Sequence, residues 1–172
     1  MAKIIWFTGL SGAGKTTLAK ILKNKLVKIN FKVKIIDGDI FRKKNKNTNN
    51  FIKTNIIKNN ISIINHIKKI QKKYDFILVA VISPVLKTRN LARIEFGKNY
   101  YEIYVKCKIT TLEQRDTKKL YEKAKKKLIK NLIGYNSKIR YEISKYKKIT
   151  INTDLLSKPE SIKKILNKIY IN

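Results

Sequence analysis

The chain has 172 residues, of which 43% are hydrophobic, and it carries a formal net charge of +30. This length and apolar content are typical of a soluble globular domain, so we expect residues 1–172 to form a single domain. No run of about 18 apolar residues is present, which excludes a membrane span, and residues 1–10 lack the pattern of a signal peptide. The single cysteine, Cys107, allows no disulfide framework, so we expect a reducing, cytoplasmic location.

The positive charge is spread along the whole chain and comes mostly from lysine. The arginines are Arg42, Arg89, Arg93, Arg115 and Arg140. Proteins that read a nucleic-acid sequence depend on arginine forks and aromatic side chains, so this pattern favours a general compositional bias over a specific nucleic-acid partner. A nucleic-acid-binding function stays open as an alternative, because a field of this size attracts any polyanion, small nucleotides included.

Five runs of apolar and β-branched residues predict strands. They cover residues 4–8, 32–36, 76–82, 101–107 and 149–153. The third run is apolar throughout, which is typical of a strand that is covered on both faces.

Segments with a helical period separate the predicted strands. Residues 16–29 put aliphatic side chains on one stripe, and residues 56–70 repeat isoleucine in the same way. The last helix is predicted to begin after Ser157, which has the spacing of a capping box with Glu160. Strands that alternate with helices predict an α/β fold, a five-stranded parallel sheet with helices on both faces.

Two further segments lack a continuous period. Residues 42–50 are polar and aperiodic, so they are predicted to form a surface loop. Residues 120–148 are predicted to be helical at first and irregular after Gly134.

A phosphate-binding motif follows the first predicted strand. The sequence GLSGAGKT, residues 9–16, matches G-x-x-x-x-G-K-[ST] between a strand and a helix, as the motif requires. Its glycines let backbone N–H groups surround phosphate oxygens, Lys15 reaches the β and γ phosphates, and the Thr16 hydroxyl is a Mg²⁺ ligand. The residues expected to bind the triphosphate are Gly9, Ser11, Gly12, Ala13, Gly14, Lys15, Thr16 and Thr17. A guanine-reading N-K-x-D motif is absent, so the motif favours a small kinase.

Two acids, Asp37 and Asp39, end the second predicted strand. Ligands of open α/β sheets bind beyond the carboxyl ends of the strands, so these acids are expected to lie beside the phosphate loop. There an acid can orient an acceptor hydroxyl, accept its proton, or hold Mg²⁺ through water. Gly38 is expected to permit a tight turn, and Arg42 to clamp an anionic acceptor. The alternative is that Asp-Gly simply ends the strand.

With these residues the chain resembles the adenylylsulfate kinase family, whose members are P-loop kinases that phosphorylate the 3′-hydroxyl of adenosine 5′-phosphosulfate. The resemblance rests on IIWFTGLSGAGKTTLA, DGDIFR, ISP with Arg89 and Arg93, RDTKKLYEKAK, and IGYNSKIRYE. It covers nearly the whole chain and implies the P-loop kinase fold, ATP with Mg²⁺ as donor, and a small nucleotide as acceptor. A homodimer is kept as a candidate assembly, and we expect no membrane partner.

The resemblance also implies roles for individual residues. Asp39 and Lys15 would be catalytic, and Arg115 would stack on the donor adenine. Ser83 matches a family serine proposed to carry phosphate transiently, although direct in-line transfer needs no such intermediate. The implied acceptor-binding residues are Asp39, Arg42, Phe51, Asn59, Ile82, Ser83, Lys118 and Leu120. The metal is assigned to Thr16, with Asp37 or Asp39 acting through water.

The chain departs from the family pattern on the acceptor side. Phe51 and Asn59 are kept, but Asn55 and Ile56 stand where the family has Asp and Arg, and residues 61–62 replace two later arginines. Two kinase functions therefore stay open: adenylylsulfate kinase, and a paralogous 3′-kinase for another nucleotide, such as cytidine diphosphoramidate in capsule synthesis. A nucleic-acid-binding P-loop protein is the alternative from another class.

Overall fold

A computed structural model describes residues 1–44 and 52–170 of the chain. Phe51 and residues 45–50 of the predicted loop therefore lie outside the described residues. Among the residues that the structure describes, none of the helices combines the length and hydropathy that a membrane crossing requires.

The centre of the fold is one parallel sheet of five strands, as the sequence predicts. The strands are β1 (Lys3–Thr8), β2 (Val33–Asp37), β3 (Phe76–Ala80), β4 (Tyr100–Lys106) and β5 (Ile149–Asn152). Their order is β2-β3-β1-β4-β5, and all four neighbouring pairs are parallel. The central strand β1 aligns Phe7 with Ala80 of β3 and with Ile103 of β4. The strand order reverses beside β1, and ligands of such sheets bind at this point.

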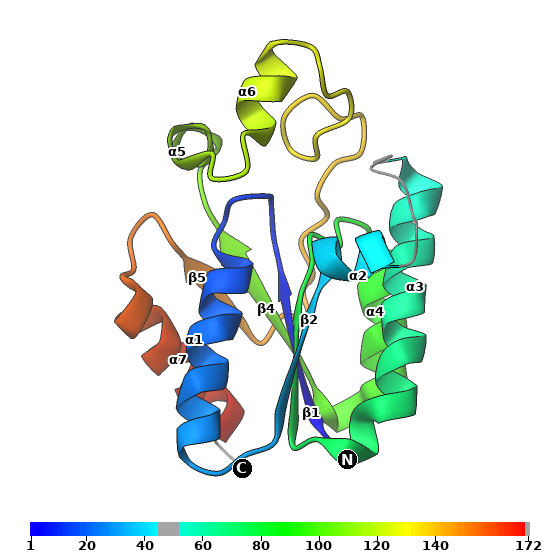
Figure 1. The fold of residues 1–172 in the computed structure, drawn as a ribbon, viewed down its shortest axis with the longest axis vertical. Coiled ribbons are helices and arrows are strands. Elements are labelled where there is room, and N and C mark those ends of the chain that lie inside the picture. The colour runs from blue at the N-terminus through cyan, green and yellow to red at the C-terminus, as the bar shows by residue number, and fades with distance from the viewer. Residues whose placement is uncertain (45–51, 171–172) are drawn as a thin grey trace.

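Helices cover both faces of the sheet (Figure 1). One face carries α1 (Lys15–Lys28) and α7 (Lys158–Tyr170), and the other carries α3 (Lys53–Ile70) and α4 (Leu86–Phe96). The short helix α2 (Gly38–Lys44) follows β2, and two 3₁₀ turns cover Gln71–Lys73 and Gly97–Asn99. Helices α5 (Ile109–Arg115) and α6 (Leu120–Lys125) lie beyond the carboxyl ends of the strands, together with the irregular chain that leads to β5.

Alternating side chains of β1 build the two halves of the core. Ile5 and Phe7 are fully buried with residues of α1 and α7, while Ile4 and Trp6 are buried with residues of α3 and α4. All five residues of β3 are buried, which agrees with its continuously apolar sequence. The sheet is therefore held between two apolar layers, and its carboxyl edge stays open for polar residues.

The capping box at the start of α7 is confirmed. The backbone N–H of Ser157 donates to the Glu160 carboxylate at 2.8 Å, and the N–H of Glu160 donates to the Ser157 hydroxyl at 3.4 Å. This reciprocal pair satisfies two donors that the first helical turn would leave without partners.

The predicted loop at residues 42–50 is wrong for residues 42–44, which belong to α2. The helix forms because the Asp37 carboxylate accepts hydrogen bonds from the N–H groups of Asp39 and Ile40, at 2.9 and 3.3 Å. A side-chain cap of this kind can begin a helix that has no apolar period. The helical part of residues 120–148 is also shorter than predicted, because α6 ends at Lys125.

Gly38 lies where the sequence predicts a tight turn, at the junction of β2 and α2 with no residue between the two elements. Gly38 begins α2 and is not among the glycines with positive φ. A Cβ at this position would lie 2.7 Å from Cγ2 of Val81. Glycine is required here for close packing against the end of β3.

Candidate functional site

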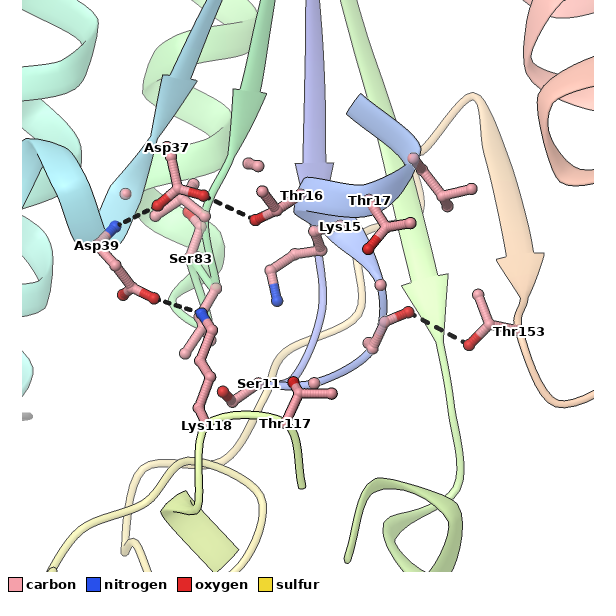
Figure 2. A pocket seen from close by; sticks show the side chains of 18 of the residues that line it. Ser11, Lys15, Thr16, Thr17, Asp37, Asp39, Ser83, Thr117, Lys118 and Thr153 are labelled. Atoms are coloured by element: carbon pink, nitrogen blue, oxygen red, sulfur yellow. Dashed lines mark hydrogen bonds and ion pairs between the residues drawn. The ribbon is translucent and has the colours of Figure 1, made fainter. Parts of the chain in front are cut away.

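A cavity of about 720 Å³ lies at the carboxyl ends of the strands. Its walls come from the phosphate loop after β1, the end of β2, one side of α3, the last residue of β3 with residues 81–84 that follow it, and the first residues of α7. Figure 2 shows polar side chains of the phosphate loop, of the end of β2 and the start of α2, and of Ser83, Lys118 and Thr153 around a common space. The structure thus brings together the phosphate loop after β1 and the acids after β2, as the sequence predicts, and it adds residues 81–84 after β3.

The phosphate loop is folded as a cradle on one side of the cavity. Gly12 and Gly14 have φ values of 78° and 96°, which favour glycine, and both line the cavity. Gly9 does not line the cavity, because it packs against β4, where a Cβ would lie 2.2 Å from the carbonyl oxygen of Val105. The predicted residues from Ser11 to Thr17 all line the cavity.

Lys15 is buried at the base of the cavity, with only 8% of its surface exposed. Its Nζ donates to the carbonyl oxygen of Leu10 at 2.6 Å. Burial, and then the nearby charge of Lys118, lower the pKa of Lys15 to about 7. An anionic ligand in the cavity would restore the charged form of this lysine, because opposite charge favours ionisation.

Asp37 connects the phosphate loop to α2. Its Oδ2 accepts a hydrogen bond from the Thr16 hydroxyl at 2.7 Å, while Oδ1 caps α2 (Figure 2). Mg²⁺ in nucleotide sites takes one or two protein oxygens and completes its shell with water and phosphate. Thr16 with Asp37 behind it fits this donor set. Within residues 1–44 and 52–170, no cluster of three or more His, Cys, Asp or Glu side chains forms an all-protein metal cage.

Asp39 lies across the cavity from the phosphate loop. It forms ion pairs with Arg42, one turn later in α2, and with Lys118, whose Nζ lies 2.5 Å from Oδ2. Burial alone would raise the pKa of Asp39, but Lys118, Arg42 and Lys15 outweigh it and hold that pKa below its usual value. Asp39 is therefore ionised at neutral pH. Lys118 reaches it from the segment between α5 and α6, so this contact closes one side of the cavity (Figure 2).

The acceptor half of the cavity combines the charged group of Asp39, Arg42 and Lys118 with uncharged residues of α3 and of the loop after β3. It includes Ile56, where the family resemblance implies an arginine, and Asn59, which is 5% exposed. Ser83 is 1% exposed, and its Oγ accepts a hydrogen bond from Asn60 Nδ2 at 3.0 Å. Ile82 also lines this half. The structure therefore brings these expected acceptor residues to one wall.

Arg115 borders the other end of the cavity. Its guanidinium donates to the carbonyl oxygen of Thr153 at 2.8 Å and to the hydroxyl of Thr153 at 3.2 Å. Thr153 in turn donates to the carbonyl oxygen of Ala13 in the phosphate loop, at 3.2 Å. These bonds fix Arg115 beside the cradle, where a stacked base would lie.

Among the described residues, two predicted site residues do not line the cavity, Gly9 and Leu120. Leu120 begins α6 and packs against the core cluster of α1 and α7 instead. Phe51 lies outside the described residues, so its predicted stacking on the acceptor base stays a prediction.

Sequence reasoning missed several residues that line the cavity. Asn60 is 1% exposed and holds Ser83, and an asparagine pair on an isoleucine-rich helix face could have signalled it. Thr153 directly follows β5, so the rule that ligands bind at the carboxyl ends of strands could have found it. Ser161, in α7, gave no signal, because its contact with the cavity depends on how α7 packs.

Comparison with known proteins gives consistent matches. The sequence model of the family described as adenylylsulphate kinase matches residues 1–152. An adenylyl-sulfate kinase of Clostridium acetobutylicum is 36% identical over 151 residues, which cover 87% of this chain and 74% of that protein. An adenylyl-sulfate kinase of Bacteroides thetaiotaomicron is 34% identical over 168 residues, covering 96% of this chain and 82% of that protein.

The fold is similar to that of a solved relative. The APS kinase CysC of Mycobacterium tuberculosis, in complex with AMPPNP and APS, matches with a TM-score of 0.90 and 25% identity. The match covers 99% of this chain and 98% of that one. The family model, the curated relatives and this structural match therefore agree on one family.

Proposed function

Because the chain belongs to the adenylylsulphate kinase family, we propose that it transfers the γ-phosphoryl group of ATP to the 3′-hydroxyl of adenosine 5′-phosphosulfate. One observation carries the proposal beyond family membership. A phosphate cradle after β1 and an ionised carboxylate, Asp39, after β2 face the same cavity at the carboxyl edge, although β3 lies between the two strands. Phosphoryl transfer needs this pairing of a held triphosphate with a group that orients the acceptor oxygen.

On the donor side, the loop from Ser11 to Thr17 binds the phosphates of ATP through backbone N–H groups and Lys15. Thr16 and Asp37 hold Mg²⁺, Thr16 directly and Asp37 through water. The ion neutralises charge on the β and γ phosphates when it is bound. Arg115 lies against the donor base, and its bonds to Thr153 support that position.

On the acceptor side, Asp39 accepts the hydrogen bond of the 3′-hydroxyl and so aims its oxygen at the γ-phosphorus. The new bond forms between these two atoms, the bond to the bridging oxygen breaks, and ADP leaves. The hydroxyl proton passes to Asp39 as the new bond forms. Arg42 and Lys118, which pair with Asp39 without ligand, turn toward the anionic groups of the acceptor.

Ser83 has a supporting role in this proposal. Its side chain is buried, and its Oγ lies 3.0 Å from Asn60 Nδ2 and 3.4 Å from the Thr88 hydroxyl. A phosphoryl group on this oxygen would have to displace both neighbours. The geometry therefore supports direct transfer between the two substrates, with Ser83 shaping the wall.

The comparisons do not favour the cytidine nucleotide alternative or the nucleic-acid-binding alternative. Requirement for Mg²⁺, a cytoplasmic location and a homodimer remain predictions of the sequence.

An acceptor panel tests the proposed function. Purified protein is incubated with Mg·ATP and either adenosine 5′-phosphosulfate or cytidine diphosphate derivatives, and 3′-phosphorylated product is followed by chromatography. We expect turnover with adenosine 5′-phosphosulfate and at least about tenfold lower kcat/KM with the cytidine compounds. Turnover with a cytidine compound alone would show that the acceptor is a cytidine nucleotide and not adenosine 5′-phosphosulfate. The absence of turnover with any acceptor would refute the proposed function.

A further inference from the structure

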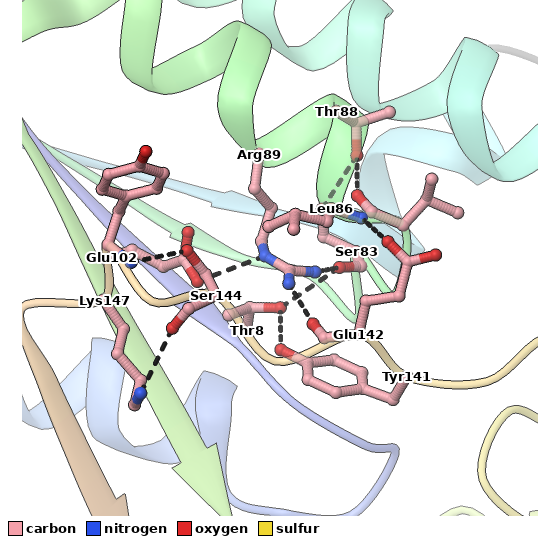
Figure 3. A network of polar contacts seen from close by, with 12 residues as sticks. Thr8, Ser83, Leu86, Thr88, Arg89, Glu102, Tyr141, Glu142, Ser144 and Lys147 are labelled. Carbon is pink, nitrogen blue, oxygen red and sulfur yellow. Dashed lines mark hydrogen bonds and ion pairs between the residues drawn. The ribbon is translucent and has the colours of Figure 1, made fainter.

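A buried arginine lies just behind the acceptor wall. Arg89, in the first turns of α4, is fully buried, and its Nε donates to Oε1 of Glu102 on β4 at 3.2 Å (Figure 3). Glu102 is only 3% exposed. Burial raises the pKa of Glu102, and the charge of Arg89 opposes that shift. Two buried charges are costly to desolvate, so a pair like this persists where its remaining hydrogen bonds are satisfied.

The other nitrogens of the guanidinium bind two separate backbone segments. Nη1 donates to the carbonyl oxygen of Ser83, and Nη2 donates to the carbonyl oxygen of Glu142. Figure 3 shows the guanidinium between these two segments and Glu102. One planar side chain therefore joins β4, the loop after β3, and the chain that returns to β5.

We call residues 141–144 the return strap. Further hydrogen bonds join the return strap to the loop after β3. The N–H of Leu86 donates to the Glu142 carboxylate at 2.6 Å, and the N–H of Glu142 donates to the carbonyl oxygen of Pro84 at 3.0 Å. At the other end, the hydroxyls of Tyr141 and Thr8 lie 2.7 Å apart, and that of Thr8 donates to the carbonyl oxygen of Ile82 at 2.6 Å. The loop at residues 82–86 is thus held on both sides of Arg89.

This loop forms part of the acceptor wall. Ser83 has a φ of 45°, a left-handed conformation that costs a serine energy and persists only where the surroundings enforce it. Ile82, Ser83 and Pro84 line the cavity, and Asn60 of α3 is bonded to the Ser83 hydroxyl. Arg89, Glu102 and the return strap do not line the cavity themselves. They can affect a ligand only by holding the wall in place.

We propose that Arg89, with Glu102 balancing its charge, is a positioning residue that fixes the acceptor wall by tying residues 82–86 to the return strap. The inference rests on the proposed function, because it names what acceptor binding depends on. The cradle residues Ser11 to Thr17 belong to another segment, and a long hydrogen bond from the N–H of Gly9 to the carbonyl oxygen of Ile82, at 3.5 Å, links the two. Arg89 therefore acts mainly on acceptor binding and changes ATP binding little.

Steady-state kinetics test this division. In Arg89→Lys, a single ammonium cannot reach Glu102, Ser83 and Glu142 together, and Glu142→Ala removes only the bond to Leu86. We expect KM for the acceptor to rise roughly tenfold in Arg89→Lys and roughly threefold in Glu142→Ala, while KM for ATP changes less than about twofold. The matched control is Glu95→Ala, which removes another carboxylate at α4, one that pairs with Lys68 at 2.9 Å. Equal changes in both KM values, or none, would overturn the proposal.

Hydrogen exchange provides a second readout that does not depend on turnover. Arg89→Lys should speed amide exchange in residues 82–86 and in the return strap together, although they are far apart in sequence, while α1 keeps its protection. Should Arg89→Lys fail to fold, Tyr141→Phe and Glu142→Ala test the same coupling. Unchanged exchange in both segments would overturn the positioning role. If the wild-type protein were inactive, only the proposed function would be refuted. The exchange experiment would still decide whether Arg89 couples residues 82–86 to the return strap.

Discussion

Lys15 combines burial with a position at the centre of the phosphate cradle. Its lowered pKa of about 7 arises from burial and from Lys118, and both act while no phosphate is bound. In the free protein, the neutral form therefore dominates above pH 7. A bound triphosphate favours the charged form and raises the pKa. Binding of ATP is thus coupled to uptake of a proton in the window between the free and bound pKa values.

This coupling predicts that ATP binding at about pH 8.5 takes up close to one proton, since an unshifted lysine titrates near pH 10.4. Isothermal titration calorimetry in buffers with different ionisation enthalpies measures the uptake. Lys15→Arg is the matched control, because a guanidinium keeps its proton at this pH and its binding should be independent of the buffer. Equal proton uptake by wild type and Lys15→Arg would show that Lys15 is already charged in the free protein.

Asp39 gives the second prediction for a single side chain. Asp39→Asn should lower kcat at least about 100-fold, because the amide neither accepts the hydroxyl proton nor carries the charge that pairs with Lys118. The dissociation constant of ATP should stay within about threefold, since the phosphate cradle is untouched. Asp75→Asn is a suitable control. Asp75 lies just before β3, at the opposite edge of the sheet, and its carboxylate accepts a hydrogen bond from the backbone N–H of Lys32. Near-normal kcat in Asp39→Asn would remove Asp39 from the chemistry.

Helix α2 depends on the packing of its first residue. Gly38→Ala should destabilise the protein by about 1–3 kcal/mol, the usual cost of overpacking, because the new methyl group meets Val81. Helix propensity alone would give the opposite sign, since alanine is favoured over glycine within a helix by about 1 kcal/mol. Urea unfolding of Gly38→Ala measures the sign directly.

A double variant separates the steric cause from other effects. Val81→Ala removes the Cγ2 atom that the new methyl group would meet. Gly38→Ala with Val81→Ala should therefore lose at least about 0.5 kcal/mol less than the sum of the single losses. Additive losses would mean that the contact with Val81 does not explain Gly38.

The strands and the phosphate loop could be predicted from the sequence, because each is encoded by neighbouring residues. Every predicted strand lies within two residues of its observed ends, since an apolar run or a strand-ending acid marks it. Helix α2 could not be predicted in this way. Its formation depends on the Asp37 cap, and its seven residues have no apolar stripe.

The chemistry of the cavity was only partly readable, because much of it depends on contacts between distant residues. Asp39 and Lys118 are 79 positions apart, and Asn60 and Ser83 are 23 apart. No local pattern encodes such pairs. The sequence could mark the ends of the first two strands as functional, but only the fold shows that Lys118 holds Asp39 and that Asn60 holds Ser83.

The whole molecule separates stability from chemistry. Two apolar layers bury the sheet between α1 and α7 on one face and α3 and α4 on the other. The segments that carry the candidate site, by contrast, gather beyond one edge of the sheet (Figure 1). The formal net charge of +30 belongs to the chain as a whole, and a net charge of this sign favours the approach of anionic substrates by long-range attraction.

The central claim is that one cavity holds both the triphosphate and the acceptor sugar. In it the 3′-hydroxyl of the acceptor donates a hydrogen bond to Asp39 while its oxygen faces the γ-phosphorus. A crystal structure of the protein with a non-hydrolysable ATP analogue and adenosine 5′-phosphosulfate measures this directly. We predict the 3′-oxygen within about 3 Å of the Asp39 carboxylate and in line with the γ-phosphorus at about 3–3.5 Å. An acceptor bound outside the cavity, or an Asp39 side chain turned away from the sugar, would contradict the account.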